Sequence, residues 1–445
     1  MSAFALLLAA EPGFSFADPW SLGLIFLAVS LFAAIGALSH QQERSFSPSL
    51  VYLGLGALAA VGLWLLGIDG IDPTQDTALL EHVTELAVVV AVFSTGLRLG
   101  RADNPRVWGH VVKLLVLVMP LTIVAVAIFG TQVMGLSLGA AIVLGSILAP
   151  TDPVLAGDVG VGPPGDESGR TEPEYALSAE AAANDGLATP FLLLGLLVAA
   201  APGSFGFLAE WVLADLIYAI VAGGVIGALG GSGLAALFAR LRERHLLLHE
   251  LDGWAGLATA LLLFALTEAA GAYGFVAAFI GGVAFRRYEY EHEYNRGVHD
   301  GMEQVEKFLE LGVILLLGSL LTLEGLQAPG PAGWLLAPLL IVVIRPLAIL
   351  ATLPGSRLSA RSQAYLAWFG VKGVASINYL AIAVGAGVLS AGEQSQIVWT
   401  VVACVVVSIV LHGLTADAVT RRTIGTQLGG PARDSEPEPA ATSAY

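Results

Sequence analysis

The chain has 445 residues, of which 56% are hydrophobic and only 13% are charged, and its mean hydropathy is +0.78. This composition suits a lipid surrounding and excludes an ordinary water-soluble domain. The net charge of −16 is placed to a large extent in polar loops and the tail, where it favours solubility, so it indicates no nucleic-acid partner.

Apolar stretches of membrane-spanning length follow one another along the chain. A spanning helix needs about 20 apolar residues to cross about 30 Å of hydrocarbon. The predicted spans are 20–38, 49–67, 80–97, 109–129, 134–151, 177–200, 208–238, 252–270, 273–286, 305–323, 333–352, 363–389 and 395–415. We therefore predict an all-α polytopic membrane protein with about 13 transmembrane helices.

The chain is predicted to hold one folded domain. Residues 1–19 are interpreted as a retained N-terminal segment, and residues 20–418 as the transmembrane domain. Residues 419–445 are polar and rich in Pro, Glu, Ala and Ser, without an apolar period, so we expect a disordered cytoplasmic tail.

The basic residues predict an orientation, because Lys and Arg concentrate in cytoplasmic loops. An outside N-terminus and a cytoplasmic C-terminus in the cell (inner) membrane place all but two of the 20 Lys and Arg on the cytoplasmic side. The two exceptions, Arg345 and Lys372, fall inside spans, where an unpaired charge costs at least about 2.5–3.5 kcal/mol. They require buried partners, and Asp152, Glu180 and Asp185 have comparable placement.

The fifth span ends in Leu148-Ala149-Pro150-Thr151-Asp152-Pro153. Each proline removes an amide donor and disfavours helical geometry in the preceding residue, so the helix is expected to open here. Opened backbone at membrane depth is tolerated where it lines a cavity, and there its carbonyls can coordinate a cation. The alternative is an ordinary helix end at the membrane surface.

The sixth span contains the acids Glu180 and Asp185. Helical spacing places Glu180 with Asn184 on one face, while Ala181 and Asp185 share a neighbouring face. The small neighbour leaves space for an ion beside Asp185, and partial burial would let a proton compete with a cation for the carboxylate. A structural ion pair with Arg345 is the alternative, and it suits Glu180 better than Asp185.

The twelfth span contains Phe369 to Ser376, in which Gly370 and Gly373 flank Lys372 and weaken the helix. We interpret it as a second broken helix. Two interrupted spans seven apart in number are expected of inverted repeats joined by one extra helix. Lys372 would offset the partial charge of a helix end or the Asp152 carboxylate, unless it extends to the membrane surface.

In combination, these motifs resemble the NhaP-type branch of the monovalent cation:proton antiporters over most of the hydrophobic region. The matching segments are Thr151-Asp152-Pro153, Glu180 with Asn184-Asp185, Arg345-Pro346 and Gly370 to Gly373. The resemblance implies an NhaA-like inverted-repeat fold with two broken, crossing helices, assembled as a homodimer. Asn184-Asp185 resembles the electroneutral signature of the family.

The resemblance also implies roles for the site residues. Asp185 would carry the cation and the proton, and Thr151 and Asp152 would complete the site. Asn184 would brace the broken helix, while Glu180 and Arg345 would form a stabilising ion pair. Lys372 stands where the family often has arginine.

Some expected ligand oxygens are missing. Some family members have a serine where this chain has Ala181, and some have an acid in the third span near Ser94. Glu85 and Glu268 are further acids in apolar spans, for which an interface or structural position is the preferred interpretation. His245, His249, His292 and His299 are interpreted as solvated rather than as a pH sensor.

Three buried acids against two buried bases leave one negative charge, which one proton or one monovalent cation neutralises. We therefore predict electroneutral one-for-one exchange of H⁺ for Na⁺, with Li⁺ or K⁺ as alternatives, by alternating access. The chain is expected to be a transporter rather than an enzyme, without cofactor or bound metal beyond the transported cation. No lysine lies in a nucleotide-binding phosphate loop, and buried Arg345 and Lys372 argue against an aspartyl hydrolase; a cation channel stays an alternative.

Overall fold

The computed structural model describes residues 19–39, 47–68, 70–99, 105–153, 171–246, 252–291, 295–353, 356 and 358–425. Within these ranges the chain forms helices and their connections, without a β-strand, so the all-α prediction is confirmed. The predicted N-terminal segment up to residue 18 and the tail from residue 426 lie outside the described residues.

Helical segments overlap each predicted span, with ends that differ by up to nine residues, and the span 363–389 is divided between two helices. The helices, with π-helical segments labelled η, are α2 (Pro19–Ser39), α3 (Pro48–Leu66), α4 (Thr77–Leu99), α5 (Pro105–Lys113), η1 (Leu114–Val118), α6 (Met119–Gln132), α7 (Leu138–Leu148), α9 (Glu172–Ala200), α10 (Leu208–Glu210), η2 (Trp211–Tyr218), α11 (Ala219–Glu243), α12 (Asp252–Ala269), α13 (Gly274–Glu291), α14 (Arg296–Ser319), α15 (Leu323–Gln327), α16 (Gly330–Leu339), η4 (Leu340–Ile344), α17 (Arg345–Thr352), α18 (Ala360–Trp368), α19 (Val374–Gly385) and α20 (Ala391–Thr423). The last helix continues five residues past 418, the predicted end of the domain.

Two of the π-helical segments precede a proline. Segment η1 comes just before Pro120, and η4 comes just before Pro346. Proline cannot donate to the preceding turn and its ring crowds the carbonyl four residues earlier, so a wider turn relieves the clash without ending the helix. The apolar helices therefore continue through these prolines, and Arg345 begins α17 directly after η4.

The helices are suited to a membrane. Among the described residues, seven helical segments are long and apolar enough to cross one, and α7 and α19 are shorter apolar helices. Large apolar side chains such as Phe32, Trp64 and Leu229 lie exposed on the outside of the bundle. Lipid is the surrounding in which such exposure is favourable, so the chain is a multi-pass membrane protein.

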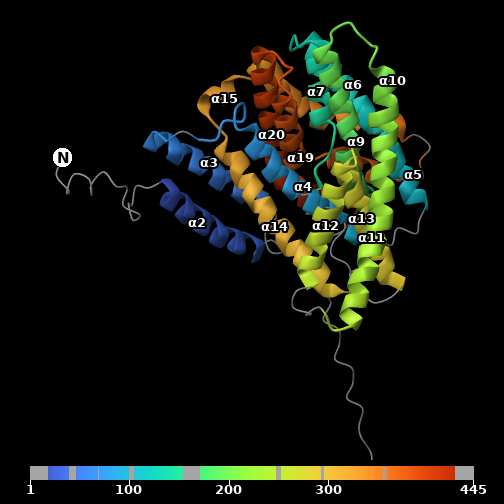
Figure 1. Cartoon of the computed structure of the whole chain (residues 1–445). Helices are drawn as coiled ribbons and strands as arrows, with labels where there is room; N and C mark the ends of the chain where they lie inside the picture. Colours follow the sequence, from blue (N-terminus) through green and yellow to red (C-terminus); the bar gives the residue numbers. More distant parts are fainter. Residues whose placement is uncertain are drawn as a thin grey trace, which may run out of the picture.

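The helices are arranged around a central group. Figure 1 shows α2 and α3 along one flank and α11 along the opposite flank, with α19 and α20 between them. Only 17% of the apolar window of the segment that contains α11 is buried inside the protein, against 72% for α20. Of the seven long apolar segments among the described residues, α20 is thus the most shielded from lipid.

Close helix pairs support this centre from one side. Helix α3 packs on α14 and α4 packs on α13. At Gly56 of α3 an added Cβ would overlap the backbone of α14 at Gly318, and at Gly96 of α4 it would overlap the backbone of α13. Glycine allows these backbones to approach, which is the usual way in which membrane helices gain packing contacts.

Candidate functional site

The first break follows α7. The helix ends at Leu148, as the two prolines predict, and Thr151 and Asp152 follow in non-helical backbone. Both residues are almost completely buried. A helix end at the membrane surface would leave them accessible, so their burial favours the predicted opening of the chain inside the protein. Residues 154–170, which follow, lie outside the described residues.

The second break separates α18 from α19. Residues 369–373 are non-helical and lie between Trp368, the last residue of α18, and Val374, the first of α19. Gly370 is required here, because an added Cβ would overlap the side chain of Arg345. The glycine signal in the sequence therefore has a steric cause, and the predicted interruption of this span is present.

The two breaks are bonded to each other. The Nζ of Lys372 donates to the carbonyl oxygens of Ala149 and Pro150, at 2.9 and 2.7 Å. In return, the amide of Ala375 donates to Oδ2 of Asp152 at 3.0 Å, and the amide of Asp152 donates to the carbonyl of Val371 at 2.9 Å. Lys372 thus lies at the negative end of α7, and Asp152 at the positive end of α19, which is the favourable arrangement for each charge.

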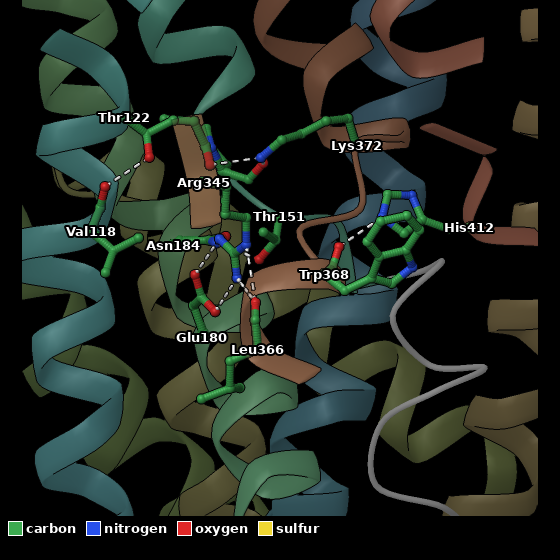
Figure 2. Close-up of polar contacts among 12 residues, drawn as sticks. Val118, Thr122, Thr151, Glu180, Asn184, Arg345, Leu366, Trp368, Lys372 and His412 are labelled. Carbon is green, nitrogen blue, oxygen red and sulfur yellow. Dashed lines mark hydrogen bonds and ion pairs between the residues drawn. The ribbon is translucent and has the colours of Figure 1, made fainter. Parts of the chain in front are cut away.

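Lys372 is 1% exposed, so it does not extend to the membrane surface. Its ammonium group donates to the carbonyls that α7 leaves unpaired at its C-terminal end, which agrees with one of the two partners considered for it. Figure 2 shows this side chain reaching across the site above Arg345 and Thr151. A buried cation is thereby satisfied by backbone dipoles instead of a direct ion pair.

Helix α9 supplies Asn184 to the first break. Its Nδ2 donates to Oγ1 of Thr151 at 2.8 Å, and both side chains are buried (Figure 2). This bond joins α9 to the non-helical backbone after α7. Asn184 thus contacts the break for which its bracing role is predicted.

Glu180 and Arg345 form a buried ion pair. Arg345 donates from Nη1 and Nη2 to the two carboxylate oxygens of Glu180, at 2.9 and 2.8 Å. It also donates to the carbonyl of Leu366 in α18, and the two charged side chains are only 4% and 3% exposed (Figure 2). The planar fork matches both oxygens, so each charge is compensated inside the protein.

Asp185 has a different surrounding from Glu180. Its side chain is completely buried, and neither carboxylate oxygen has a hydrogen-bond partner among the described residues. Its backbone carbonyl accepts a short hydrogen bond from the hydroxyl of Tyr379 in α19. The charges of Asp152 and Lys372 act on it electrostatically. A buried carboxylate without fixed donors is free to take a proton or a cation.

Several residues that the sequence did not single out take part in this region. Tyr379 contacts the Asp185 backbone, and Ser376 donates to the carbonyl of Ile147 at 3.0 Å. Ser408 and His412 of α20 contact the second break. The signal for them in the sequence was weak. They are polar residues at helical spacing in apolar helices, and such residues also occur as hydrogen-bonded core residues without a function.

An acid lies beside Ser94, although the third span itself supplies none there. Ser94 donates to Oε2 of Glu306 at 2.6 Å, and Arg98 pairs with the same carboxylate. Glu306 comes from α14 and is buried, so it supplies an acid beside Ser94 from another helix. The hydroxyl of Ser94 is thus engaged in an ion-pair cluster of α4 and α14.

The interpretation of His299 as solvated is wrong. His299 is buried and lies 2.8 Å from Oε2 of Glu289, which Arg286 also contacts. His245 is exposed, as expected, while His249 and His292 lie outside the described residues. Of the two further acids, Glu268 accepts from the amide of Gly274 at 2.7 Å and so caps α13, which supports a structural interpretation.

Comparison with known proteins places these features in a family. Residues 13–422 match the family described as sodium/hydrogen exchanger, transmembrane. The Na(+)/H(+) antiporter 2 of Zygosaccharomyces rouxii is 27% identical over 79% of this chain and 45% of its own length. The K(+)/H(+) antiporter NhaP of Alkalimonas amylolytica is 25% identical over 90% of this chain and 67% of its own length.

A solved structure of the sodium proton antiporter MjNhaP1 from Methanocaldococcus jannaschii has the same fold. It is 19% identical, with a TM-score of 0.72 over 93% of this chain and 99% of that chain. The fold and the paired breaks thus define a membrane protein of the exchanger class. The chain belongs to the sodium/hydrogen exchanger family, and its predicted resemblance to the NhaP-type branch is confirmed. This is a family of transporters, as predicted, and not of enzymes.

Proposed function

We propose that this chain is a secondary antiporter that exchanges one monovalent cation for one proton. The observation that carries the proposal is Asp185, a completely buried carboxylate whose two oxygens have no hydrogen-bond partner in the described structure. Family membership supports the same function. The curated relatives are named as Na(+)/H(+) and K(+)/H(+) antiporters, although the chain spans only 45% of the length of the yeast relative.

In this proposal Asp185 binds either a proton or a cation. Thr151 and Asp152, which lie at the first break, would complete the cation site with backbone carbonyl oxygens. Asn184 would hold this break against α9 through its bond to Thr151. The Ala181 side chain supplies no oxygen, so the remaining ligands would come from the backbone and from water in the open state.

The charges of the site favour electroneutral exchange. Arg345 compensates Glu180 in a direct pair, and Lys372 and Asp152 lie at opposite helix ends. Asp185 is then left as the one uncompensated acid, so one H⁺ or one Na⁺ restores neutrality. Li⁺ is an alternative, and so is K⁺, which the name of the Alkalimonas relative favours.

The proposal includes the architecture that alternating access needs. Thirteen spans would form two inverted repeats, whose broken helices cross at the site. The N-terminus would lie outside and the C-terminus in the cytoplasm of the cell (inner) membrane, and the protein would be a homodimer. Alternating exposure of Asp185 to the two sides would carry the ions, whereas a cation channel would expose it to both sides at once.

The experiment uses the purified full chain in proteoliposomes with a pH dye and an imposed pH gradient. Addition of Na⁺, Li⁺ or K⁺ is expected to collapse the gradient, while choline has no effect. Clamping the membrane potential at different values with valinomycin and K⁺ should leave the Na⁺-driven rate unchanged. Absence of a response to all three cations would contradict antiport, and a rate that follows the potential would contradict one-for-one exchange.

A further inference from the structure

The non-helical segment of residues 369–373 lacks the regular hydrogen bonds of a helix, so its backbone groups need other partners inside the protein. In a membrane core an unpaired amide or carbonyl costs several kcal/mol, so every such group must be accounted for. The carbonyl of Val371 accepts from Asp152, in the first break. The carbonyl of Trp368, just before the segment, accepts from the amide of Gly370 at 2.8 Å. Helix α20 contacts this carbonyl a second time and also bonds the amide of Lys372.

Helix α20 presents Ser408 and His412 to this segment. The amide of Lys372 donates to Oγ of Ser408 at 2.8 Å. Nε2 of His412 lies 2.9 Å from the carbonyl oxygen of Trp368, and Figure 2 shows this contact. The two residues are one helical turn apart, so they lie on the same face of α20. Ser408 is 0% exposed and His412 is 4% exposed. They reach the segment at both of its ends.

Each ring nitrogen of His412 lies within hydrogen-bond distance of a carbonyl oxygen. A carbonyl oxygen only accepts, so Nε2 must carry a hydrogen to bond Trp368. Nδ1 lies 3.1 Å from Oγ of Ser408 and 2.8 Å from its carbonyl oxygen. When Nε2 carries the ring hydrogen, Nδ1 is an acceptor. The Ser408 hydroxyl then accepts from the backbone amide of Lys372 and donates to Nδ1 of His412. Lys372 and Arg345 are the charged groups that act on the ring.

The position of this segment determines where Lys372 and α19 lie. The bond to Ser408 is made by the amide of Lys372 itself, the residue whose Nζ donates to the carbonyls of Ala149 and Pro150. Three residues further, the amide of Ala375 donates to Asp152. A displaced segment would therefore move both charged contacts that connect the two breaks.

We propose that Ser408 and His412 are positioning residues, which hold the second break so that Lys372 and the first turn of α19 reach the first break. They touch no transported ion and act through Lys372 and Asp152. The inference rests on the proposed antiport function. It assigns α20 a part in transport, because its Ser408 and His412 form a chain of hydrogen bonds that connects Lys372 to Trp368.

The transport test compares His412→Ala and Ser408→Ala with His412→Gln, whose amide can still donate to Trp368. Loss of one buried hydrogen bond should change the apparent KM for the cation about five-fold and shift the pH profile. His412→Gln should stay within about two-fold of the unaltered protein. Maximal rate is normalised to the folded protein recovered, so a purely structural loss would lower yield without changing KM.

Thr415→Val is the matched control. Thr415 lies on the same helix, and its Oγ1 accepts from the indole nitrogen of Trp368 at 3.2 Å, so it contacts the side chain and not the backbone of the break. Its KM and pH profile should be unchanged. The proposal is overturned if Ser408→Ala and His412→Ala keep the normal KM and pH profile, or if Thr415→Val alters them equally. If His412→Ala does not fold, the apparent KM and pH profile of Ser408→Ala alone test the proposal.

A second measurement does not depend on transport. Nitrogen-15 NMR of labelled histidines in the membrane-embedded protein reports which ring nitrogens carry hydrogen, and His412→Gln identifies the signal among the eight histidines by its absence. Nε2 of His412 is expected to be protonated at neutral pH; an unprotonated Nε2 overturns the assignment. If the unaltered protein shows no cation-driven flux while Nε2 is protonated, the antiport proposal fails and the positioning contact stands.

Discussion

Two carboxylates on α9, five positions apart, have opposite surroundings. Glu180 receives two hydrogen bonds from the guanidinium of Arg345, which is itself bonded to α18. Asp185 is buried to the same degree but has no donor on either oxygen within the described structure. Burial alone therefore does not distinguish an acid in a structural ion pair from the acid that we propose exchanges the ion. The difference is whether the protein itself supplies the compensating charge.

The ion pair should dominate stability. Glu180→Gln leaves the Arg345 charge buried without its partner, which costs about 3–5 kcal/mol of folding free energy. Thermal melting of the detergent-solubilised protein should show a large drop in Tm or little folded protein. The double variant Glu180→Gln with Arg345→Met should regain much of the loss, because no buried charge is left unpaired. An unchanged melting curve for Glu180→Gln would contradict the structural role.

Lys372 should matter next, because it connects the two breaks. Lys372→Met removes two donors from the end of α7 and one positive charge from the site. We expect the exchange rate in proteoliposomes to fall at least about ten-fold, equivalent to about 1.4 kcal/mol. Lys372→Arg, which keeps the charge but changes the donor geometry, should retain part of the activity. A normal rate for Lys372→Met would show that the crossing contact is dispensable.

The Asn184 brace should have a moderate effect. Asn184→Ala and Thr151→Val each remove the same 2.8 Å hydrogen bond, which is worth about 1 kcal/mol or a five-fold change in apparent KM. Because both changes delete one interaction, the double variant should be little worse than either single variant. Fully additive effects in the KM measurement would mean that the two residues act independently.

Ser94 should have the smallest effect. Its hydroxyl is bonded to Glu306, in a cluster with Arg98, and not to Asp185. Ser94→Ala should leave the apparent KM for the cation within about two-fold of normal and lower Tm slightly. If Ser94→Ala instead weakens cation binding as much as Asn184→Ala, the hydroxyl belongs to the cation site.

Much of this arrangement was accessible from local chemistry. Hydrophobic length predicted the helices, and proline and glycine predicted the two breaks at Thr151 and Gly370. The need to compensate each charge in an apolar span left a few buried acids as partners for Arg345, and the family resemblance pointed to Glu180, which is 165 residues distant. These inferences succeed because each depends on one strong local penalty.

Other features depend on which helix faces which, and this is not encoded locally. Tyr379, Ser408 and His412 are common residues at ordinary helical spacing, and only the packing of α19 and α20 brings them to the site. Glu306 similarly reaches Ser94 from α14. The buried position of His299 was missed because its partner, Glu289, lies on a different helix.

The central claim is that Asp185 alone exchanges the ion, and Asp185→Asn tests it most directly. Asparagine keeps the shape of the side chain and removes a buried charge that has no hydrogen-bond partner among the described residues, so the protein should fold and melt at least as well as the unaltered chain. In proteoliposomes with a pH dye, Na⁺, Li⁺ and K⁺ should then produce no cation-dependent change of the pH gradient. Cation-dependent proton flux that persists in folded Asp185→Asn would contradict the account.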